Sequence, residues 1–209
     1  MSALSEFLPY VLPYVAGCST PLAEMHLRRI CIDFCTYTSV VQATLDPMDA
    51  VQGQIQYDID TPQGMETAFI LDAHLNGHML PILNGIGTTA FAGELPPGIP
   101  TALQQLVGNE MVLDRAPYIT MPAAITLHVS LKPTRNTNNV ADVLFNDYAV
   151  PIGYGVVAHL MMMPGHRFSN PGMAQIYENN YQRERTEARI RANKGFAQAS
   201  SRVTPRRFI

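Results

Sequence analysis

The sequence predicts an α+β fold, in which an antiparallel helical bundle carries an inserted small antiparallel β domain and an extended C-terminal arm. Two changes in the spacing of apolar residues support this prediction. The spacing changes from the 3.6-residue period of a helix to the 2-residue period of a strand at Val51, and it returns to the helical period at Val140. A third observation is the basic end of the chain, in which the Gly-, Ala- and Ser-rich residues 195–201 have little apolar surface to bury. We expect the bundle at about residues 20–42 and 139–194, and the β domain at about residues 50–132.

The length of 209 residues and the mass of 23.0 kDa suit one domain, or one domain with an insertion. We divide the chain into four parts. These are an N-terminal segment with the first bundle helix at 1–49, the inserted β domain at 50–132, the C-terminal bundle helices at 133–194, and the extended basic docking arm at 195–209.

The first helix has a clear beginning in the sequence. Residues 5–15 are apolar but contain Pro9 and Pro13, which predicts a short broken helix or an extended segment packed on a larger surface. Thr20 can cap the helix that follows, and Pro21 suits its first turn. A buried stripe should run to about Val41, on residues spaced by three and four positions: Leu27, Ile30, Cys31 and Phe34.

The three cysteines leave one thiol unpaired in any disulfide scheme. Cys31 and Cys35 lie four residues apart and therefore share one face of the predicted helix. We interpret them as buried free thiols, because a free cysteine behaves as a small apolar residue. Metal binding would need two further ligands, and the nearest histidine, His26, points away from that face.

The β domain is predicted from alternation and turn signals. Residues 51–60 alternate between apolar or small residues and polar ones, which indicates a half-buried antiparallel strand. Asn76 and Gly77 predict a hairpin turn between strands at 66–75 and 78–83. A second strong strand points four side chains inward: Ile125, Leu127, Val129 and Leu131. Residues 85–119 are rich in Gly and Pro, which predicts long loops with one helical turn at about residues 102–107.

Two further helices are predicted near the end of the chain. Asn139 can cap the first, in which apolar residues recur every four positions: Val140, Leu144, Tyr148, Ile152, Val156 and Leu160. Pro151 should kink this helix, and Gly153 and Gly155 should let a neighbour approach closely. Residues 163–165, Met-Pro-Gly, end it, and Asn170 caps the last helix. That helix offers three residues to the core in its early turns: Ala174, Tyr177 and Tyr181.

The charge is low and unevenly distributed. Charged residues make up 15% of the chain, which suits a surface partly covered by partners. From residue 183 onward, eight basic residues against two acidic ones give a net charge of +6, which leaves −9 for the rest. An acidic body with a basic end predicts that the end binds something negatively charged, either a protein or nucleic acid. A solvent-exposed helix face followed by a loose end is the alternative.

Sequence motifs for common enzyme chemistry are absent: the chain has no GxxxxGK[ST], GxGxxG, HExxH or GxSxG. We therefore expect no catalytic centre and no cofactor. His74 and His78 flank the predicted hairpin turn and would face each other, so a two-ligand metal site is an alternative interpretation. Asp58 and Asp60 could hold a cation, although the exposed face of a strand needs polar residues in any case. Nucleic-acid binding is disfavoured, because no aromatic residues alternate with the arginines and the body is acidic.

Four segments resemble the head-to-tail adaptor (connector) proteins of tailed bacteriophages, the tail tubular protein A type. FLPYVLPYVAGCSTPLAEMHLRRICIDFC at residues 7–35 resembles the family's Pro-bearing start and amphipathic helix. ILDAHLNGHML at 70–80 resembles its central hairpin, and residues 144–189 resemble its paired C-terminal helices, joined through Met-Pro-Gly and Asn-Pro. RVTPRRF at 202–208 resembles its arginine-bearing tail. The chain departs from the family at Phe168, where tryptophan is frequent, and at Pro151, which interrupts a helix expected to be regular.

The resemblance implies a non-enzymatic structural virion protein. It implies a homo-oligomeric ring, twelvefold, between the portal protein and the tail nozzle protein, with double-stranded DNA passing non-specifically through its lumen. Low charge suits subunits that cover one another, and an acidic lumen would repel DNA in transit. The protein would be assembled in the host cytoplasm and lie in the neck or tail of the virion. Another tail-completion or minor capsid protein is the alternative, followed by a hydrolase or a carbohydrate-binding module.

The docking arm follows from composition and resemblance together. Gly, Ala and Ser at residues 195–201 predict a flexible strap that does not fold alone. The remainder combines arginines, which can bind carboxylates, with apolar anchors. We expect the arm to be extended and to bind the portal protein through eight residues: Arg202, Val203, Thr204, Pro205, Arg206, Arg207, Phe208 and Ile209. No membrane segment is expected, because the longest apolar stretch, 149–163, is interrupted and short. The first residues lack the basic start of a secretory signal.

Overall fold

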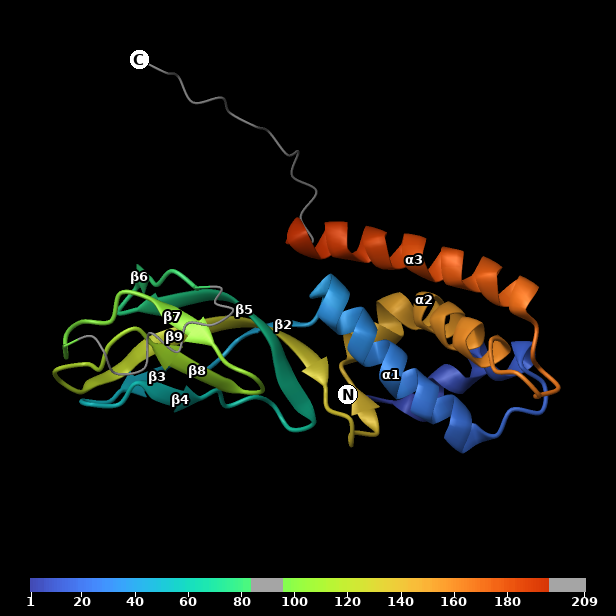
Figure 1. The fold of residues 1–209 in the computed structure, drawn as a ribbon, viewed down its shortest axis with the longest axis horizontal. Helices are drawn as coiled ribbons and strands as arrows, with labels where there is room; N and C mark the ends of the chain where they lie inside the picture. Colours follow the sequence, from blue (N-terminus) through green and yellow to red (C-terminus); the bar gives the residue numbers. More distant parts are fainter. Residues whose placement is uncertain (84–95, 196–209) are drawn as a thin grey trace, which may run out of the picture.

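The computed structural model describes residues 1–83 and 96–195 and shows an elongated molecule, with helices at one end and most strands at the other (Figure 1). The helices are η1 (Leu4–Tyr10), η2 (Leu12–Tyr14), α1 (Thr20–Thr38), α2 (Asp142–Met161) and α3 (Pro171–Asn193). The strands are β1 (Ser2–Ala3), β2 (Gln42–Thr44), β3 (Met48–Ala50), β4 (Gln56–Asp58), β5 (Met65–Leu75), β6 (His78–Met79), β7 (Leu103–Gln105), β8 (Glu110–Leu113), β9 (Met121–Pro133) and β10 (Asn139–Val140).

Helix α1 forms where the sequence predicts it. Pro21 lies in its first turn, with Ser19 as the cap residue instead of Thr20. The helix ends at Thr38 rather than Val41, because Ser39 adopts a left-handed conformation with φ of 53° and turns the chain into β2. The predicted stripe is confirmed, since four residues are buried: Leu27, Ile30, Cys31 and Phe34.

Strand β9 is the centre of the largest sheet. It pairs antiparallel with β2 and β3 along one edge and with β5 along the other, and β6 continues the sheet beyond β5. The predicted inward-facing residues of β9 are all buried: Ile125, Leu127, Val129 and Leu131. Asn76 and Gly77 have φ of 51° and 79°, so the predicted hairpin turn between β5 and β6 is confirmed.

Two β-bulges reset the alternation of β5. The pairing register with β9 shifts between Thr67 and Phe69, and again between Ile70 and Asp72. Thr67 and Ile70 are buried as a result, whereas Phe69 and Leu71 are exposed. Strict two-residue alternation would have placed Phe69 and Leu71 on the same buried face as Thr67. Their exposure therefore depends on the two bulges.

A second sheet of order β4-β8-β7 lies beside the part of the β5 edge that β6 does not pair with, and a third, smaller sheet pairs β1 with β10. Side-chain amides join the second sheet to β5. The Asn109 side-chain oxygen accepts a hydrogen bond from the Thr67 amide at 2.7 Å, and that of Gln105 accepts one from the Ile70 amide at 2.9 Å. These bonds satisfy backbone groups that another strand would otherwise pair.

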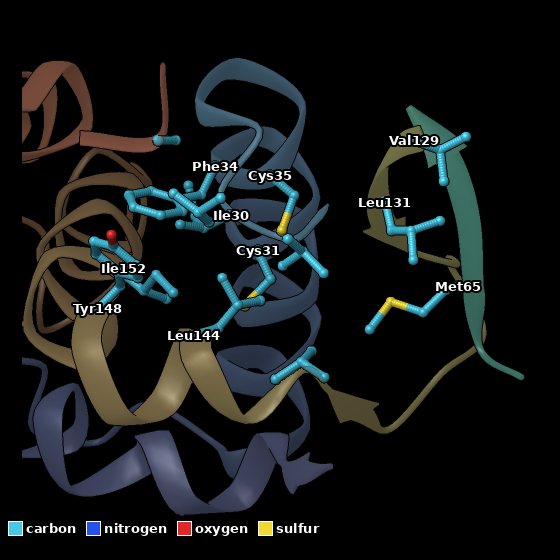
Figure 2. Close-up of a cluster of buried hydrophobic side chains, with 14 of the residues drawn as sticks. Ile30, Cys31, Phe34, Cys35, Met65, Val129, Leu131, Leu144, Tyr148 and Ile152 are labelled. Atoms are coloured by element: carbon cyan, nitrogen blue, oxygen red, sulfur yellow. The ribbon is translucent and has the colours of Figure 1, made fainter. Parts of the chain in front are cut away.

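The core continues from the helices into the strands through α1. Figure 2 shows Ile30 and Phe34 of α1 beside residues of α2, and Cys31 and Cys35 on the side of α1 nearer β9 and β5. Phe34 is fully buried, with its ring centroid 5.1 Å from that of Tyr148. Helix α1 therefore has two buried sides, one toward α2 and one toward the sheet.

Helices α2 and α3 pack together and against α1. The side chain of Asn170 accepts a hydrogen bond from the Met173 amide at 3.2 Å, which confirms the predicted cap of α3. A Cβ atom at Gly155 would lie 3.0 Å from the Tyr181 ring and 3.1 Å from Ile30, so this glycine lets α2 and α3 approach closely. The kink in α2 falls at Tyr148, three residues before Pro151, because the proline ring disturbs the preceding turn. Ala141, rather than Asn139, is the cap residue of α2.

The N-terminal segment packs on its own chain. It forms the two 3-10 helices, interrupted at Val11, as the prolines predict. Four of its apolar residues are buried: Leu4, Phe7, Val11 and Val15. The carbonyl oxygen of Tyr10 lies 3.1 Å from the Cβ position of Gly153, which explains why α2 has no side chain there.

The predicted fold class is wrong. The structure is 39% helical and 27% strand, with its strands in three antiparallel sheets, one of them curled into a half-barrel. It is not a helical bundle with a small inserted β domain. The physical reason is that β5 and β9 supply one side of the core on which α1 packs, so the strands share the helical core instead of forming an appendage.

Two predictions within the β region are also wrong. Residues 51–60 form a strand only at β4, because Gly53 has φ of 79° and turns the chain after Val51. The predicted helical turn at 102–107 is occupied by β7, which pairs with β8 across a turn at Gly108. Both strands have too few residues for a periodic signal. Residues 84–95 of the predicted loop lie outside the described residues.

Replacing Phe34 by alanine should lower the free energy of unfolding by about 3–5 kcal/mol, because it removes a fully buried ring between α1 and α2. Urea denaturation followed by circular dichroism measures this change. The control is Met79→Ala on β6, where the side chain is 70% exposed, and it should change stability by less than about 0.5 kcal/mol. Equal effects of the two substitutions would contradict the shared core.

Candidate functional site

The predicted docking residues 202–209 lie outside the described residues, so their placement stays a prediction. The structure does describe α3, the helix from which the arm departs. The end of α3 and the elements that hold it in place therefore form the candidate site.

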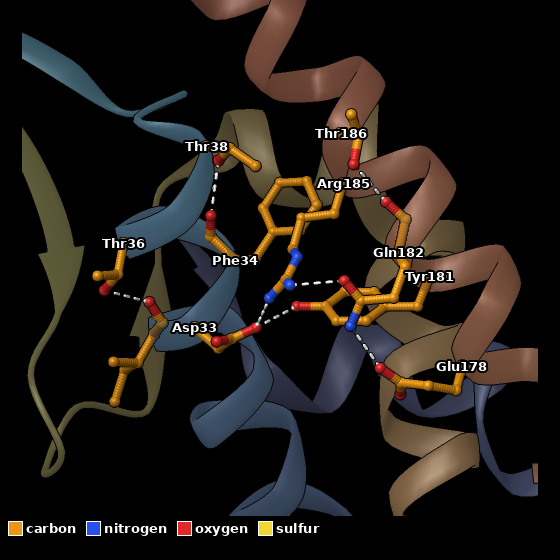
Figure 3. Close-up of polar contacts among 10 residues, drawn as sticks. Asp33, Phe34, Thr36, Thr38, Glu178, Tyr181, Gln182, Arg185 and Thr186 are labelled. Atoms are coloured by element: carbon orange, nitrogen blue, oxygen red, sulfur yellow. Dashed lines mark hydrogen bonds and ion pairs between the residues drawn. The ribbon is translucent and has the colours of Figure 1, made fainter. Parts of the chain in front are cut away.

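A polar network fixes α3 to α1 (Figure 3). The hydroxyl group of Tyr181 donates a hydrogen bond to the carboxylate of Asp33 at 2.8 Å, and the guanidinium group of Arg185 forms an ion pair with the same carboxylate oxygen. Arg185 also donates to the side chain of Gln182 at 2.6 Å. The Arg185 side chain is only 13% exposed but that of Asp33 is 50% exposed, so the ion pair is partly shielded from water on the arginine side.

Tyr37 extends the network toward the end of α3. The guanidinium carbons of Arg185 and Arg189 lie 4.1 and 5.0 Å from the centroid of the Tyr37 ring, which is cation–π geometry. A hydrogen bond with Thr186, together with the nearby arginines, lowers the pKa of the Tyr37 hydroxyl. The result is a rigid connection between the last turns of α1 and α3.

A surface groove of about 390 Å³ lies beside this connection. We call it the α3-end groove, and its lining residues are Thr36, Tyr37, Thr38, Ser39, Phe69, Leu71, Arg189 and Asn193. It joins the ends of α1 and α3 to the face of β5 on which the bulges expose two apolar side chains. The groove thus combines aromatic, aliphatic and cationic groups at the place where α3 ends. Sequence analysis missed it because it depends on the bulges in β5.

The two histidines of the hairpin do not form a metal site. His74 pairs in register with Met79, and His78 pairs with Leu75. Since neighbouring residues of a strand point to opposite faces, the two imidazoles point away from each other. The predicted facing pair is therefore wrong. Asp58 is the last residue of β4, and Asp58 and Asp60 are both exposed on either side of the buried Ile59, as the alternation predicts.

The structure brings together two histidines that sequence analysis treated as scattered. The rings of His26 on α1 and His159 on α2 lie 6.2 Å apart in an edge-to-face arrangement. Burial lowers the pKa of each imidazole, and the positive charge of Arg29 lowers both further, whereas Glu178 and Asp33 act in the opposite direction on His159. The Nδ1 atom of His26 is buried without a hydrogen-bond partner.

Cys31 and Cys35 are free and buried, as predicted. Burial raises the pKa of the Cys31 thiol to about 12 and that of Cys35 well above its ordinary value. Both thiols are therefore protonated and unreactive at neutral pH. In residues 1–83 and 96–195, no group of three or more His, Cys, Asp or Glu side chains is arranged to hold a metal ion.

Within that described part of the chain, no helix combines the length and the apolar character needed to cross a membrane. A scan against protein-family models finds no match, and a search of curated proteins finds none that matches the chain.

Lowering the pH should destabilise the protein through the His26–His159 pair. The folded-state pKa of both groups lies below the unfolded value of about 6.5, so the unfolded chain binds more protons as the pH falls through that value. The stability contributed by the neutral pair is thus complete above about pH 6.5 and is lost as the pH falls toward the lowered folded-state pKa. Urea denaturation at about pH 7.5 and about pH 5.5 should show a lower free energy of unfolding at the acidic pH.

The double substitution His26→Gln and His159→Gln should reduce this dependence on pH. The matched control is His78→Gln, since this histidine is exposed on β6. If the control and the double variant show the same pH dependence as the unsubstituted protein, the pair is not responsible.

Proposed function

We propose that this protein is a head-to-tail adaptor of a tailed bacteriophage, a structural subunit of a ring between the portal protein and the tail nozzle protein. DNA passes through the lumen of the ring, and no catalysis is involved. The ring is homo-oligomeric and twelvefold. The protein is assembled in the host cytoplasm and becomes part of the neck of the virion.

One observation carries the proposal: the segments that resemble the adaptor family are packed together in the fold. Residues 7–35 form η1, η2 and α1, and residues 144–189 form most of α2 and α3, which pack on α1. The hairpin segment 70–80 belongs to β5 and β6, in the sheet whose central strand β9 also packs on α1. The segments that resemble the family thus meet at α1, which belongs to the first of them.

The surface supports a subunit that is covered by neighbours. Large apolar side chains are exposed among both the helices and the strands, including Tyr14 in η2 and Val107 in the turn after β7, which is 96% exposed. Exposed apolar groups on different faces suit a ring, in which each subunit contacts two neighbours through two different patches.

Native mass measurement of the purified full chain, alone and mixed with portal rings of the same phage, tests the proposal. We expect a cyclic oligomer of this chain, formed alone or on the portal ring, and its mass gives the number of subunits. A chain that remains monomeric in both samples and hydrolyses an ester, phosphate or glycoside substrate would overturn it. A complex that lacks the portal but contains another virion protein would favour a different tail-completion protein.

The arm supplies a separate prediction. Deleting residues 203–209 should abolish attachment to portal rings, because it removes two arginines and the apolar anchors Val203, Phe208 and Ile209. Co-sedimentation with portal rings measures attachment. A second variant replaces Phe208 alone by alanine, and it should weaken attachment if the arm binds the portal protein through its apolar anchors. If the arm instead contacted DNA phosphates, binding would survive this substitution and weaken steeply with salt. Normal attachment of the truncated chain would contradict portal docking.

A further inference from the structure

Three arginines line one hollow beside α1. The hollow has a volume of about 440 Å³ and lies between α1 and the turn that joins β9 to β10. We call it the arginine hollow, and its lining residues are Met25, Arg28, Arg29, Ile32 and Arg135. Such a concentration of positive charge is unusual in a chain whose first 182 residues carry a net charge of −9.

Arg28 is held in place by the turn. Its Nε atom donates a hydrogen bond to the carbonyl oxygen of Thr137 at 2.8 Å, and its Nη2 atom donates to the side-chain oxygen of Asn138 at 2.9 Å. These two acceptors are neutral, so the charge of the guanidinium group is not neutralised by them. The bonds orient a cation at the hollow before any partner binds.

The other two arginines have no ion pair within residues 1–83 and 96–195. Arg29 and Arg135 are exposed, and neither lies within ion-pair distance of a described carboxylate. The acidic residue one helical turn after Arg29 is Asp33, and its carboxylate binds Tyr181 and Arg185 of α3 instead. The packing of α3 therefore takes away the carboxylate that would otherwise be the natural partner of Arg29.

A complementary acidic pair occurs in the β4-β8-β7 sheet. Asp58 and Glu110 are direct cross-strand partners of β4 and β8. Like charges placed directly opposite each other destabilise a sheet. The side-chain amide of Gln56 donates a hydrogen bond to the Glu110 carboxylate at 3.0 Å, and this donor is neutral. Neither carboxylate has an ion pair in the part of the chain that the structure describes. A cationic partner would remove the repulsion between them.

We propose that the arginine hollow of one copy of this chain binds the Asp58–Glu110 pair of a second copy. This inference rests on the ring of the proposed function and names its subunit interface. A ring requires two different, complementary patches on each subunit, and the two clusters provide them with opposite charge. They lie on different elements, α1 with the β9–β10 turn and the β4–β8 edge, so a head-to-tail arrangement pairs each hollow with the next subunit's carboxylates.

A protein partner suits the hollow better than DNA does. Met25 and Ile32 supply apolar surface between the arginines, and Met25 is 53% exposed. Apolar contacts beside oriented arginines are typical of protein interfaces. Binding of DNA phosphates at the hollow would be opposed by the excess negative charge of the body.

Charge reversal tests the interface. One variant carries Arg29→Glu and Arg135→Glu, and a second carries Asp58→Arg and Glu110→Arg. Each should raise the protein concentration needed for ring assembly by about tenfold or more, because like charges then face each other across the interface. The chain that combines all four substitutions restores opposite charges and should assemble at close to the original concentration. Native mass spectrometry measures the assembled fraction at several concentrations, with portal rings present if they are needed for assembly.

The matched control reverses two exposed charges elsewhere, Arg167→Glu and Asp147→Arg, and should assemble normally. Far-ultraviolet circular dichroism and thermal unfolding of every variant show whether it folds, and recovery by the fourfold variant excludes misfolding as the cause of failed assembly. Failure of the fourfold variant to assemble although it is folded would overturn the inference.

The remaining outcomes separate this inference from the proposed function. If the unsubstituted chain forms rings and the two charge-reversed variants do so equally well, the interface is wrong but the adaptor ring stands. If the unsubstituted chain never forms rings, both proposals fail. A gel-shift assay with a 30-base-pair duplex, about three turns of B-form DNA, tests whether the hollow binds DNA. Loss of duplex binding in the arginine variant without loss of assembly would make the hollow a DNA site and overturn the subunit interface.

Discussion

The contact of α1 with two different partners is the interaction on which the structure depends. Ile30 and Phe34 contact α2, whereas Cys31 and Cys35 lie nearer to the sheet, so one helix joins the two parts of the core. Strand β9 packs on α1 and in turn fixes β2, β3 and β5 through its two edges. If α1 were exposed on one side, as in a two-layer helix pair, the strands would have no apolar surface on which to pack.

The polar side of α1 carries both Asp33, which contacts α3, and Arg29, which lines the arginine hollow. Asp33 is used to hold α3 through Tyr181 and Arg185, and this allocation leaves Arg29 without a carboxylate on its own subunit. The same contact therefore stabilises the fold and produces an unbalanced positive surface. Such an imbalance costs little in a monomer, because salt screens exposed charges, and the subunit interface that we propose would supply the opposite charge.

In the half-barrel, the edge of β5 is covered, whereas apolar side chains on the face of β5 are exposed. The amides of Gln105 and Asn109 close the edge of β5 where a further strand could add, which prevents uncontrolled edge-to-edge association. The bulges in β5 then expose Phe69 and Leu71 beside the end of α3. The ring that we propose would use this combination, in which the edge of β5 is covered and apolar side chains beside it are exposed.

The sequence by itself determined the elements that have a long periodic signal. The stripe on α1, the inward face of β9, the hairpin turn at Asn76 and the cap at Asn170 were all predictable, because each depends on local backbone preferences or on one buried face. Only the tertiary structure decided how these elements combine. Short strands such as β4 and β7 carry too few residues to show a period, and bulges shift side chains without changing composition. The pairing of Asp33 with α3, the meeting of His26 with His159 and the grouping of three arginines at one hollow join residues far apart in sequence, and such contacts depend on packing that no local pattern encodes.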